Sequence, residues 1–413
     1  MGILWNRRTF LGSVAAVAGS AWSGVKVFAS TGPQESKLTG LGSTGNVYDE
    51  LGVTTLINGQ GTMTELGGSL IRPEVDAVMA QATQHFVRIP DLEVAAGKRI
   101  AQLLKLPDGY TAIVTSGAAA AIQSGLAGVL TGDDEALIRQ LPDVTGMKSE
   151  VIIQKSHRNA FDHQLRGTGI KLIAVETLDE FKAAAGPRTA MTYFLNLADP
   201  MGQIKREDWL KLCQERNIPA MIDAAADTPP VSHLWDYANM GFDMITFSGG
   251  KAMRGPQCAG LLIGREKMVH CALLNNSPYE DTIGRGMKVG KEEIVGMVKA
   301  LELYLNEDHD AITAEWWKRL NLISGEITKV AGVSTADFVP EIANHVPHMR
   351  INWDPQKIKL TPEEAFQALR SGKPSIMLAD SPGGLAMNSF MLQPGEDKII
   401  AGRLVELFRA HAA

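Results

Sequence analysis

Cysteine and positive charge are both scarce in this sequence. The 413 residues include three cysteines, Cys213, Cys258 and Cys271. An odd number at irregular spacing does not fit a disulfide framework, and it predicts no metal site. Lysine and arginine number 40 against 46 acidic residues, so the net charge is −6. Such a chain has no general attraction to nucleic acid, and no nucleic-acid partner is predicted.

Long hydrophobic runs are also missing. The one apolar run near the N-terminus is short and rich in glycine, so no membrane span is expected in the mature protein. No internal repeat is visible. Hydrophobic residues make up 45% and charged residues 21% of the chain, which is ordinary for a soluble globular enzyme. The length allows two or three domains with a large core.

The first 29 residues have the pattern of a twin-arginine signal peptide. Arg7 and Arg8 are followed by Phe10, Leu11 and a weakly apolar run, and small residues before position 30 suit cleavage. This predicts a periplasmic or otherwise exported protein that uses the twin-arginine machinery. The alternative is a frayed N-terminus with a chance arginine pair on a cytoplasmic protein. Residues 30–46 are rich in Ser, Thr and Gly and are predicted to be a linker.

The rest of the chain divides by pattern into three parts. Residues 47–90 form a glycine-rich N-terminal segment. Between 91 and 290 short apolar runs alternate with helical patterns, which predicts an α/β domain with a mostly parallel sheet. Residues 291–413 are expected to hold a bridging helix and a small α+β domain. The predicted strands of the large domain are 111–114, 151–154, 171–175, 191–197, 218–222, 244–247 and 259–263.

A phosphate site is predicted where the strand at 111–114 meets the next helix. Ser116, Gly117 and Ala118 have small side chains, so backbone N–H groups and the helix N-terminus can approach a phosphate. The alternative is a serine-capped helix with an alanine-rich packing face. The stretch matches neither a P-loop nor a dinucleotide-binding turn, which makes a nucleotide less favoured here.

Lys251 and Asp223 follow two later strands. Lys251 comes after two glycines, and a lysine held among small and apolar residues tends toward its neutral, nucleophilic form. Such an amine can form a Schiff base with pyridoxal phosphate. Asp223, at the carboxyl end of a strand, can keep a pyridine nitrogen protonated. The alternatives are an exposed lysine in a β-turn and a helix-capping aspartate.

Two further residues lie at the ends of predicted strands. His157 follows the strand at 151–154, where an imidazole can stack on an aromatic cofactor; otherwise it is a surface histidine. Ser248, three residues before the lysine, can donate to a phosphate; otherwise it is a turn residue.

These features together resemble one enzyme family. The sequence is similar to fold-type I pyridoxal-phosphate enzymes of the aspartate-aminotransferase superfamily, within the selenocysteine synthase-like group that includes D-glucosaminate-6-phosphate ammonia-lyases. The matching segments are INGQGT at 57–62, TSGAAAAI at 115–122, MIDAA at 221–225, TFSGGKAMRGPQCAG at 246–260 and GRGMKVGKEEIVG at 284–296. The resemblance covers about residues 46–410.

The resemblance implies pyridoxal 5'-phosphate, a seven-stranded-type sheet in the large domain and at least a homodimer. Lys251 would be the Schiff-base lysine and Asp223 the partner of the ring nitrogen. The phosphate would be held by Ser116, Gly117, Ala118 and Ser248, and the ring would be covered by His157. An anionic substrate or the phosphate would be bound by Arg254, Arg285 and Lys288, whose alternative is solvated surface charge. The group often has an arginine after a Pro-x-Ile strand, and residues 374–380 (PSIMLAD) have none.

The expected activity is α,β-elimination of ammonia-lyase type on a small amino acid or amino-sugar acid. Racemisation and aldol cleavage would share the first step and remain alternatives. A selenium transferase is a further alternative, which the acidic composition and the lack of an RNA-binding module before residue 46 disfavour. A non-catalytic binding protein on the same fold also remains open.

Overall fold

The computed structural model describes residues 41–42 and 45–413. The chain divides into two compact units, Met1–Thr55 and Leu56–Ala413. In the first unit, the short helix α2 (Val47–Glu50) begins after Asn46, whose side chain accepts a hydrogen bond from the Tyr48 N–H at 2.9 Å. The predicted signal peptide and most of the predicted linker lie outside the described residues.

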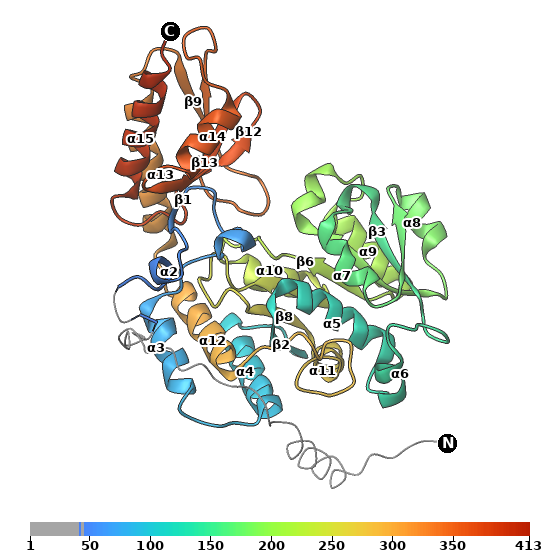
Figure 1. The fold of residues 1–413 in the computed structure, drawn as a ribbon. Coiled ribbons are helices and arrows are strands. Elements are labelled where there is room, and N and C mark those ends of the chain that lie inside the picture. The colour runs from blue at the N-terminus through green and yellow to red at the C-terminus, as the bar shows by residue number, and fades with distance from the viewer. Residues whose placement is uncertain (1–40, 43–44) are drawn as a thin grey trace, which may run out of the picture. The chain divides into compact units, whose positions relative to one another are not determined.

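The second unit contains a seven-stranded sheet in the order β2-β8-β7-β6-β5-β3-β4 (Figure 1). Strand β8 runs antiparallel to both of its neighbours, and the other pairs are parallel. The predicted mostly parallel sheet is therefore confirmed. The strands are β2 (Tyr110–Thr115), β3 (Glu150–Gln154), β4 (Lys171–Val175), β5 (Thr189–Leu195), β6 (Ala220–Asp223), β7 (Met244–Ser248) and β8 (Gly260–Arg265).

Both faces of this sheet are covered by helices. Successive side chains of a strand point to opposite faces, and on β3 Ile152 packs in one core cluster while Val151 and Ile153 pack in another. A strand buried on both faces is apolar throughout, which explains the continuous apolar runs of the sequence. The first cluster draws on α4 (Ile89–Leu104), α8 (Leu178–Ala184), α9 (Arg206–Arg216), α10 (His233–Met240) and α12 (Lys291–Leu305), and the second on α5 (Gly117–Thr131), α7 (His163–Arg166) and α11 (Glu266–Leu274).

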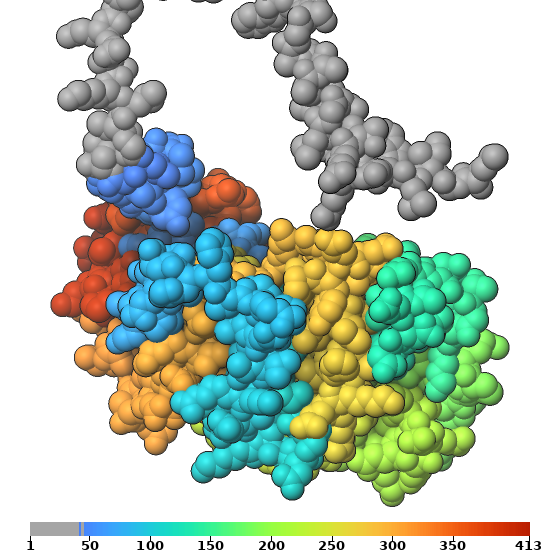
Figure 2. All heavy atoms as spheres, turned by 90° about the horizontal axis from the view of Figure 1, so that it is seen from below, coloured from blue at the N-terminus to red at the C-terminus, as the bar shows by residue number. Residues whose placement is uncertain are grey.

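Helix α11 and the chain that follows it reach the molecular surface between two groups of helices. Figure 2 shows residues 266–290, in yellow, between the blue to cyan helices α3 (Pro73–Ala82) and α4 and the green segment around α6 (Glu135–Gln140). Helices α3 and α4 also pack on α12. None of the described helices is long and apolar enough to cross a membrane.

The C-terminal part forms a smaller α+β layer around its own core. A four-stranded antiparallel sheet has the order β12-β13-β10-β9, and a separate parallel pair joins β1 (Leu56–Asn58) to β11 (Ser375–Met377). Ile57 and Ile376 pair in register and share this core, so the N-terminal strand is part of the small domain. The remaining elements are α13 (His309–Ile327), β9 (Val333–Phe338), β10 (His348–Trp353), α14 (Pro362–Arg370), β12 (Ala379–Ser381), β13 (Gly384–Asn388) and α15 (Glu396–Ala410).

Candidate active site

The predicted phosphate site lies at the N-terminus of α5. The Ser116 side chain caps none of the described helix's N–H groups, and Gly117 has φ +80°, which favours glycine. Gly260 on β8 packs closely against this turn. A Cβ at position 260 would lie 2.5 Å from the Gly117 carbonyl carbon and 2.7 Å from the Ala118 nitrogen. Because no side chain among the described residues caps the first N–H groups of this 15-residue helix, they can bind an anion.

Asp223 is a buried carboxylate held by hydrogen-bond donors. It ends β6, and it is 5% exposed. Its Oδ2 accepts a hydrogen bond from the Tyr193 hydroxyl at 2.6 Å, and its Oδ1 accepts from the Ala225 N–H at 3.0 Å. The Tyr193 hydroxyl acts only as a donor here, because burial and then the Asp223 charge raise its pKa well above the ordinary value. These two donors hold the carboxylate group in a fixed orientation at the end of the strand.

Lys251 lies in a tight turn between β7 and β8. The glycines before it have no room for a side chain: a Cβ at Gly249 would lie 2.8 Å from the Ala259 carbonyl oxygen, and a Cβ at Gly250 would lie 2.8 Å from the Gln257 Cα. Burial lowers the pKa of the Lys251 amine, and the Asp223 and Asp227 carboxylates oppose that shift. Among the described residues the amine has no hydrogen-bond or ion-pair partner. The burial therefore favours the neutral form of the amine, whereas the two carboxylates favour the charged form.

Asp227 is a member of the site that the sequence reasoning missed. Its Oδ2 accepts hydrogen bonds from the Tyr237 hydroxyl at 2.9 Å and from the Asn196 amide at 2.7 Å. Burial raises the pKa of Asp227 to about 7, and these two donors hold it lower than burial alone would. The signal was present in the MIDAAAD segment, where a second aspartate follows Asp223 by four residues.

His157 lies directly after β3, as predicted, but its ring is turned into the core. The side chain is 0% exposed, and its ring meets the Phe194 ring edge-on at 4.5 Å between centroids. Its Nδ1 accepts a hydrogen bond from the Leu195 N–H at 3.2 Å. Burial lowers the pKa of His157 to about 4, although the Glu176 charge raises it. The role of covering a cofactor ring stays a prediction, and it requires this ring to turn outward.

The other predicted residues fall in two places. Ser248 ends β7, and its N–H donates to the Ala225 carbonyl at 3.4 Å, so it lies beside the Asp223 loop. Arg254 is half-buried in the turn that begins at Lys251, where its N–H donates to the Lys251 carbonyl at 2.9 Å. Arg285 is half-buried and Lys288 is exposed, both in the segment after α11. Their roles toward a substrate stay predictions.

These groups fit pyridoxal phosphate in chemical type. Lys251 is half-buried, and burial lowers the pKa of its amine, which favours covalent attachment to an aldehyde. Asp223 is a buried acceptor on the neighbouring strand, because it pairs in register with Thr246 of β7. At the N-terminus of α5 the Ser116 side chain caps no N–H group, and Gly260 of β8 packs closely against the turn. Among the described residues no group of three or more His, Cys, Asp or Glu is placed to hold a metal ion.

Comparison with known proteins agrees with this chemistry. The Aminotransferase class-V family profile matches residues 77–277. The D-glucosaminate-6-phosphate ammonia lyase of Salmonella typhimurium is 27% identical over 90% of this chain and 100% of its own length. The 5'-C-glycyluridine monooxygenase-decarboxylase of a Streptomyces species is 25% identical over 88% of this chain and 92% of its own. The L-seryl-tRNA(Sec) selenium transferase of Moorella thermoacetica is 25% identical, but the match spans 59% of that protein.

Solved structures give the same relationship. A structure of D-glucosaminate-6-phosphate ammonia-lyase superposes with a TM-score of 0.78 at 26% identity, over 89% of this chain and 99% of the other. The fold-type I, aspartate-aminotransferase-like fold expected from the sequence is confirmed. The resemblance to the ammonia-lyase and selenocysteine synthase-like group is confirmed as well.

Proposed function

We propose that this chain, with its class-V aminotransferase profile and ammonia-lyase-like fold, is a pyridoxal-phosphate-dependent lyase acting on a small amino acid or amino-sugar acid. One observation carries the proposal: the half-buried Lys251 amine, three residues after β7, lies within the electrostatic influence of Asp223, at the end of the adjacent β6. Ligands of parallel α/β sheets bind at these carboxyl ends.

Each residue of the site has a separate task in binding. Ser116, Gly117, Ala118 and Ser248 would hold the phosphate, which the N-terminus of α5 favours electrostatically. Asp223 would keep the ring nitrogen protonated, with Tyr193 holding the carboxylate in place. When bound, pyridoxal phosphate supplies an electron sink for the electron pair released at the substrate's α-carbon.

Lys251 is the base of the proposed reaction. Burial lowers the pKa of its amine and so favours the neutral form, in which Nζ can take the proton from the α-carbon. The substituent on the β-carbon then leaves with the electrons of its bond. Water converts the released unsaturated amine to a keto product and ammonia. Asp227 lies close enough to affect the Lys251 charge, and its own pKa near 7 means that this influence changes around neutral pH.

A product screen tests this function. Purified protein is incubated with D- and L-amino acids and amino-sugar acids, and ammonia and keto products are measured, with Lys251→Ala as the inactive control. Ammonia with loss of a β-substituent is the expected result. Release of an aldehyde would instead indicate aldol cleavage, and inversion of the α-carbon would indicate a racemase. If no amine alters the visible absorbance of the bound cofactor and no product forms, the chain is a binding protein.

We further propose that the protein is exported and assembles at least as a homodimer. Support for export is the arginine pair at Arg7 and Arg8 with its flanking pattern. Support for assembly is the exposed apolar turn between α3 and α4, where Phe86 is fully exposed and Val87 is 49% exposed. Arg7→Lys with Arg8→Lys should hold folded protein in the cytoplasm, which cell fractionation measures, and light scattering measures the assembly. Unchanged export of the double variant would refute the export signal, and a cofactor-bound monomer would refute the dimer.

A further inference from the structure

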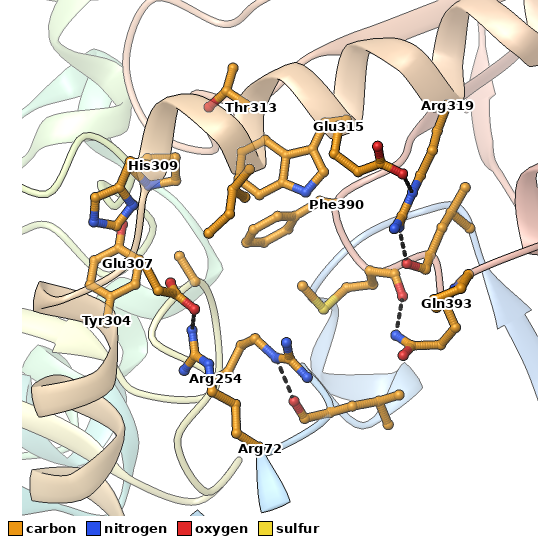
Figure 3. Close-up of a pocket in the computed structure, with 18 residues that line it drawn as sticks. Arg72, Arg254, Tyr304, Glu307, His309, Thr313, Glu315, Arg319, Phe390 and Gln393 are labelled. Carbon is orange, nitrogen blue, oxygen red and sulfur yellow. Dashed lines mark hydrogen bonds and ion pairs between the residues drawn. The ribbon is translucent and has the colours of Figure 1, made fainter. Parts of the chain in front are cut away.

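A cavity of about 290 Å³ is lined by Arg254, three residues after Lys251 (Figure 3). Its walls come from residues 70–72, from residues 252–254, from the junction of α12 and α13, and from residues 390–394. Ala252 and Arg254 line it, whereas Lys251 itself does not. The cavity therefore borders the turn that carries Lys251 but is not lined by Lys251 or Asp223.

The charge in this cavity is unbalanced. Three arginines and two glutamates line it. Glu307 forms an ion pair with Arg72, and Glu315 forms one with Arg319 at 3.1 Å. Arg254 has no acidic ion-pair partner among the described residues; its Nε donates only to the Leu70 carbonyl at 2.8 Å. Burial and then the charge of Arg72 lower the pKa of Arg254, so two guanidinium groups repel each other here.

The backbone holds Arg254 in place at a cost. Its φ is +53°, a left-handed conformation that a non-glycine residue rarely adopts. Arg72 fixes the same turn, because its Nη1 donates to the Met253 carbonyl at 2.8 Å. A conformation of this kind persists only where its surroundings determine it, and such positions are common at ligand sites.

Two polar atoms in the cavity wall have no partner among the described residues. They are the Tyr304 hydroxyl, on a side chain that is 3% exposed, and the Nε2 of His309. Burial raises the pKa of the Tyr304 hydroxyl, and the nearby Thr228 side chain lowers that pKa. The Thr228 side chain nevertheless forms no hydrogen bond with the Tyr304 hydroxyl. Beyond them the wall is aromatic: the rings of Trp316 and Phe390 meet edge-on at 5.0 Å between centroids.

We propose that this cavity binds a small organic anion, a carboxylate or phosphate carried on an apolar or aromatic body. The anionic group would lie between Arg254 and Arg72, where it relieves their repulsion, and the Tyr304 hydroxyl would donate to it. The body would pack against Trp316 and Phe390. The anion is either the end of the amino substrate that lies away from its amino group or a separate effector. The first of these two cases rests on the proposed function.

Calorimetric titration of the cofactor-loaded protein tests the site directly. The probes are 3-phenylpropionate and phenyl phosphate, with the neutral 3-phenylpropionamide as the chemical control. We expect the anions to bind and the amide not to bind. Arg254→Gln should weaken anion binding at least about tenfold, and Tyr304→Phe should weaken it with no loss of folding, because phenylalanine keeps the ring. Arg139→Gln, which alters an exposed arginine on α6, should bind as the wild type does.

Three results would overturn the proposal: no binding of either anion, equal binding of the amide, or wild-type affinity in both cavity variants. The source of the anion is then found by kinetics. A probe that raises KM in competition with the substrate marks the substrate's far end, whereas a probe that alters kcat marks an effector. Because binding is measured without turnover, loss of the lyase assignment would leave the titration result intact.

Discussion

Tyr193 donates a hydrogen bond to Asp223 at 2.6 Å, and both side chains are buried. The two residues come from adjacent parallel strands, β5 and β6. The hydrogen bond therefore holds the Asp223 side chain against the neighbouring strand. In the proposed enzyme this tyrosine is a positioning residue, which acts on the cofactor through Asp223.

Tyr193→Phe tests that positioning role. A hydrogen bond to a charged group contributes about 1.5–3 kcal/mol, so we expect pyridoxal phosphate to be retained about tenfold more weakly. Equilibrium dialysis of the loaded protein measures this. Tyr110→Phe is the matched control, because the Tyr110 hydroxyl is also buried but donates to the Phe242 carbonyl at 2.8 Å. Equal loss of the cofactor in both variants would assign Tyr193 to general stability.

Asp223→Asn should leave the fold intact and lower turnover by at least about a hundredfold, because an amide cannot balance a protonated ring nitrogen. Steady-state kinetics on the substrate found in the product screen measures the effect. Asp243→Asn is the matched control. It makes the same change at the opposite ends of β6 and β7, where the Asp243 carboxylate accepts a hydrogen bond from the Ala220 N–H at 2.9 Å. Turnover of Asp223→Asn within a few-fold of wild type would make this carboxylate structural.

Glu93 predicts a pH dependence of stability. This glutamate of α4 is 1% exposed, and its Oε2 accepts from the Val114 N–H at 2.9 Å. Burial raises the pKa of Glu93 from 4.5 to about 8, although the hydrogen bond from Val114 lowers it. The folded state then keeps a proton that the unfolded state has lost, so stability falls as pH rises from about 4.5 to about 8. The full effect of one such group is about 4–5 kcal/mol.

Glu93→Gln should remove this slope, because glutamine cannot ionise yet still offers an oxygen to Val114. The free energy of unfolding, from denaturant titrations at acidic and alkaline pH, measures the difference between variant and wild type. Glu135→Gln, at an exposed position of α6, should keep the wild-type slope. A pH slope that is the same in Glu93→Gln and wild type would show that Glu93 does not titrate in this range.

Much of the site could be predicted because its residues follow strands. Asp223 directly follows an apolar run and Lys251 follows another after a short Ser-Gly-Gly turn, and parallel strands bring their carboxyl ends to one edge of the sheet. Tyr193 could not be found in this way. It lies inside an apolar run, and its contact with Asp223 depends on the pairing of β5 with β6. The cavity beside Arg254 depends on contacts between residues that are still farther apart in the sequence, such as the hydrogen bond between Arg254 and Leu70.

Local patterns also set the limits of the fold prediction. A capping box of Thr361 and Glu364, which a sequence can reveal, begins helix α14. The 19-residue helix α13 was missed, because only Leu320, Ile323 and Ile327 of it are buried and the apolar pattern is weak. Strand β1 was missed for another reason: it is three residues long, and its partner β11 lies more than 300 residues away along the chain.

The most direct test of the account is where the cofactor is attached. Purified protein loaded with pyridoxal phosphate is reduced with borohydride, digested and analysed by mass spectrometry. The account predicts a visible absorbance band before reduction, and afterwards one modified peptide with the added mass on Lys251. Lys251→Ala should show neither and should have no turnover. A modification on any other lysine, or a cofactor-loaded protein in which Lys251 stays unmodified, would contradict the central claim.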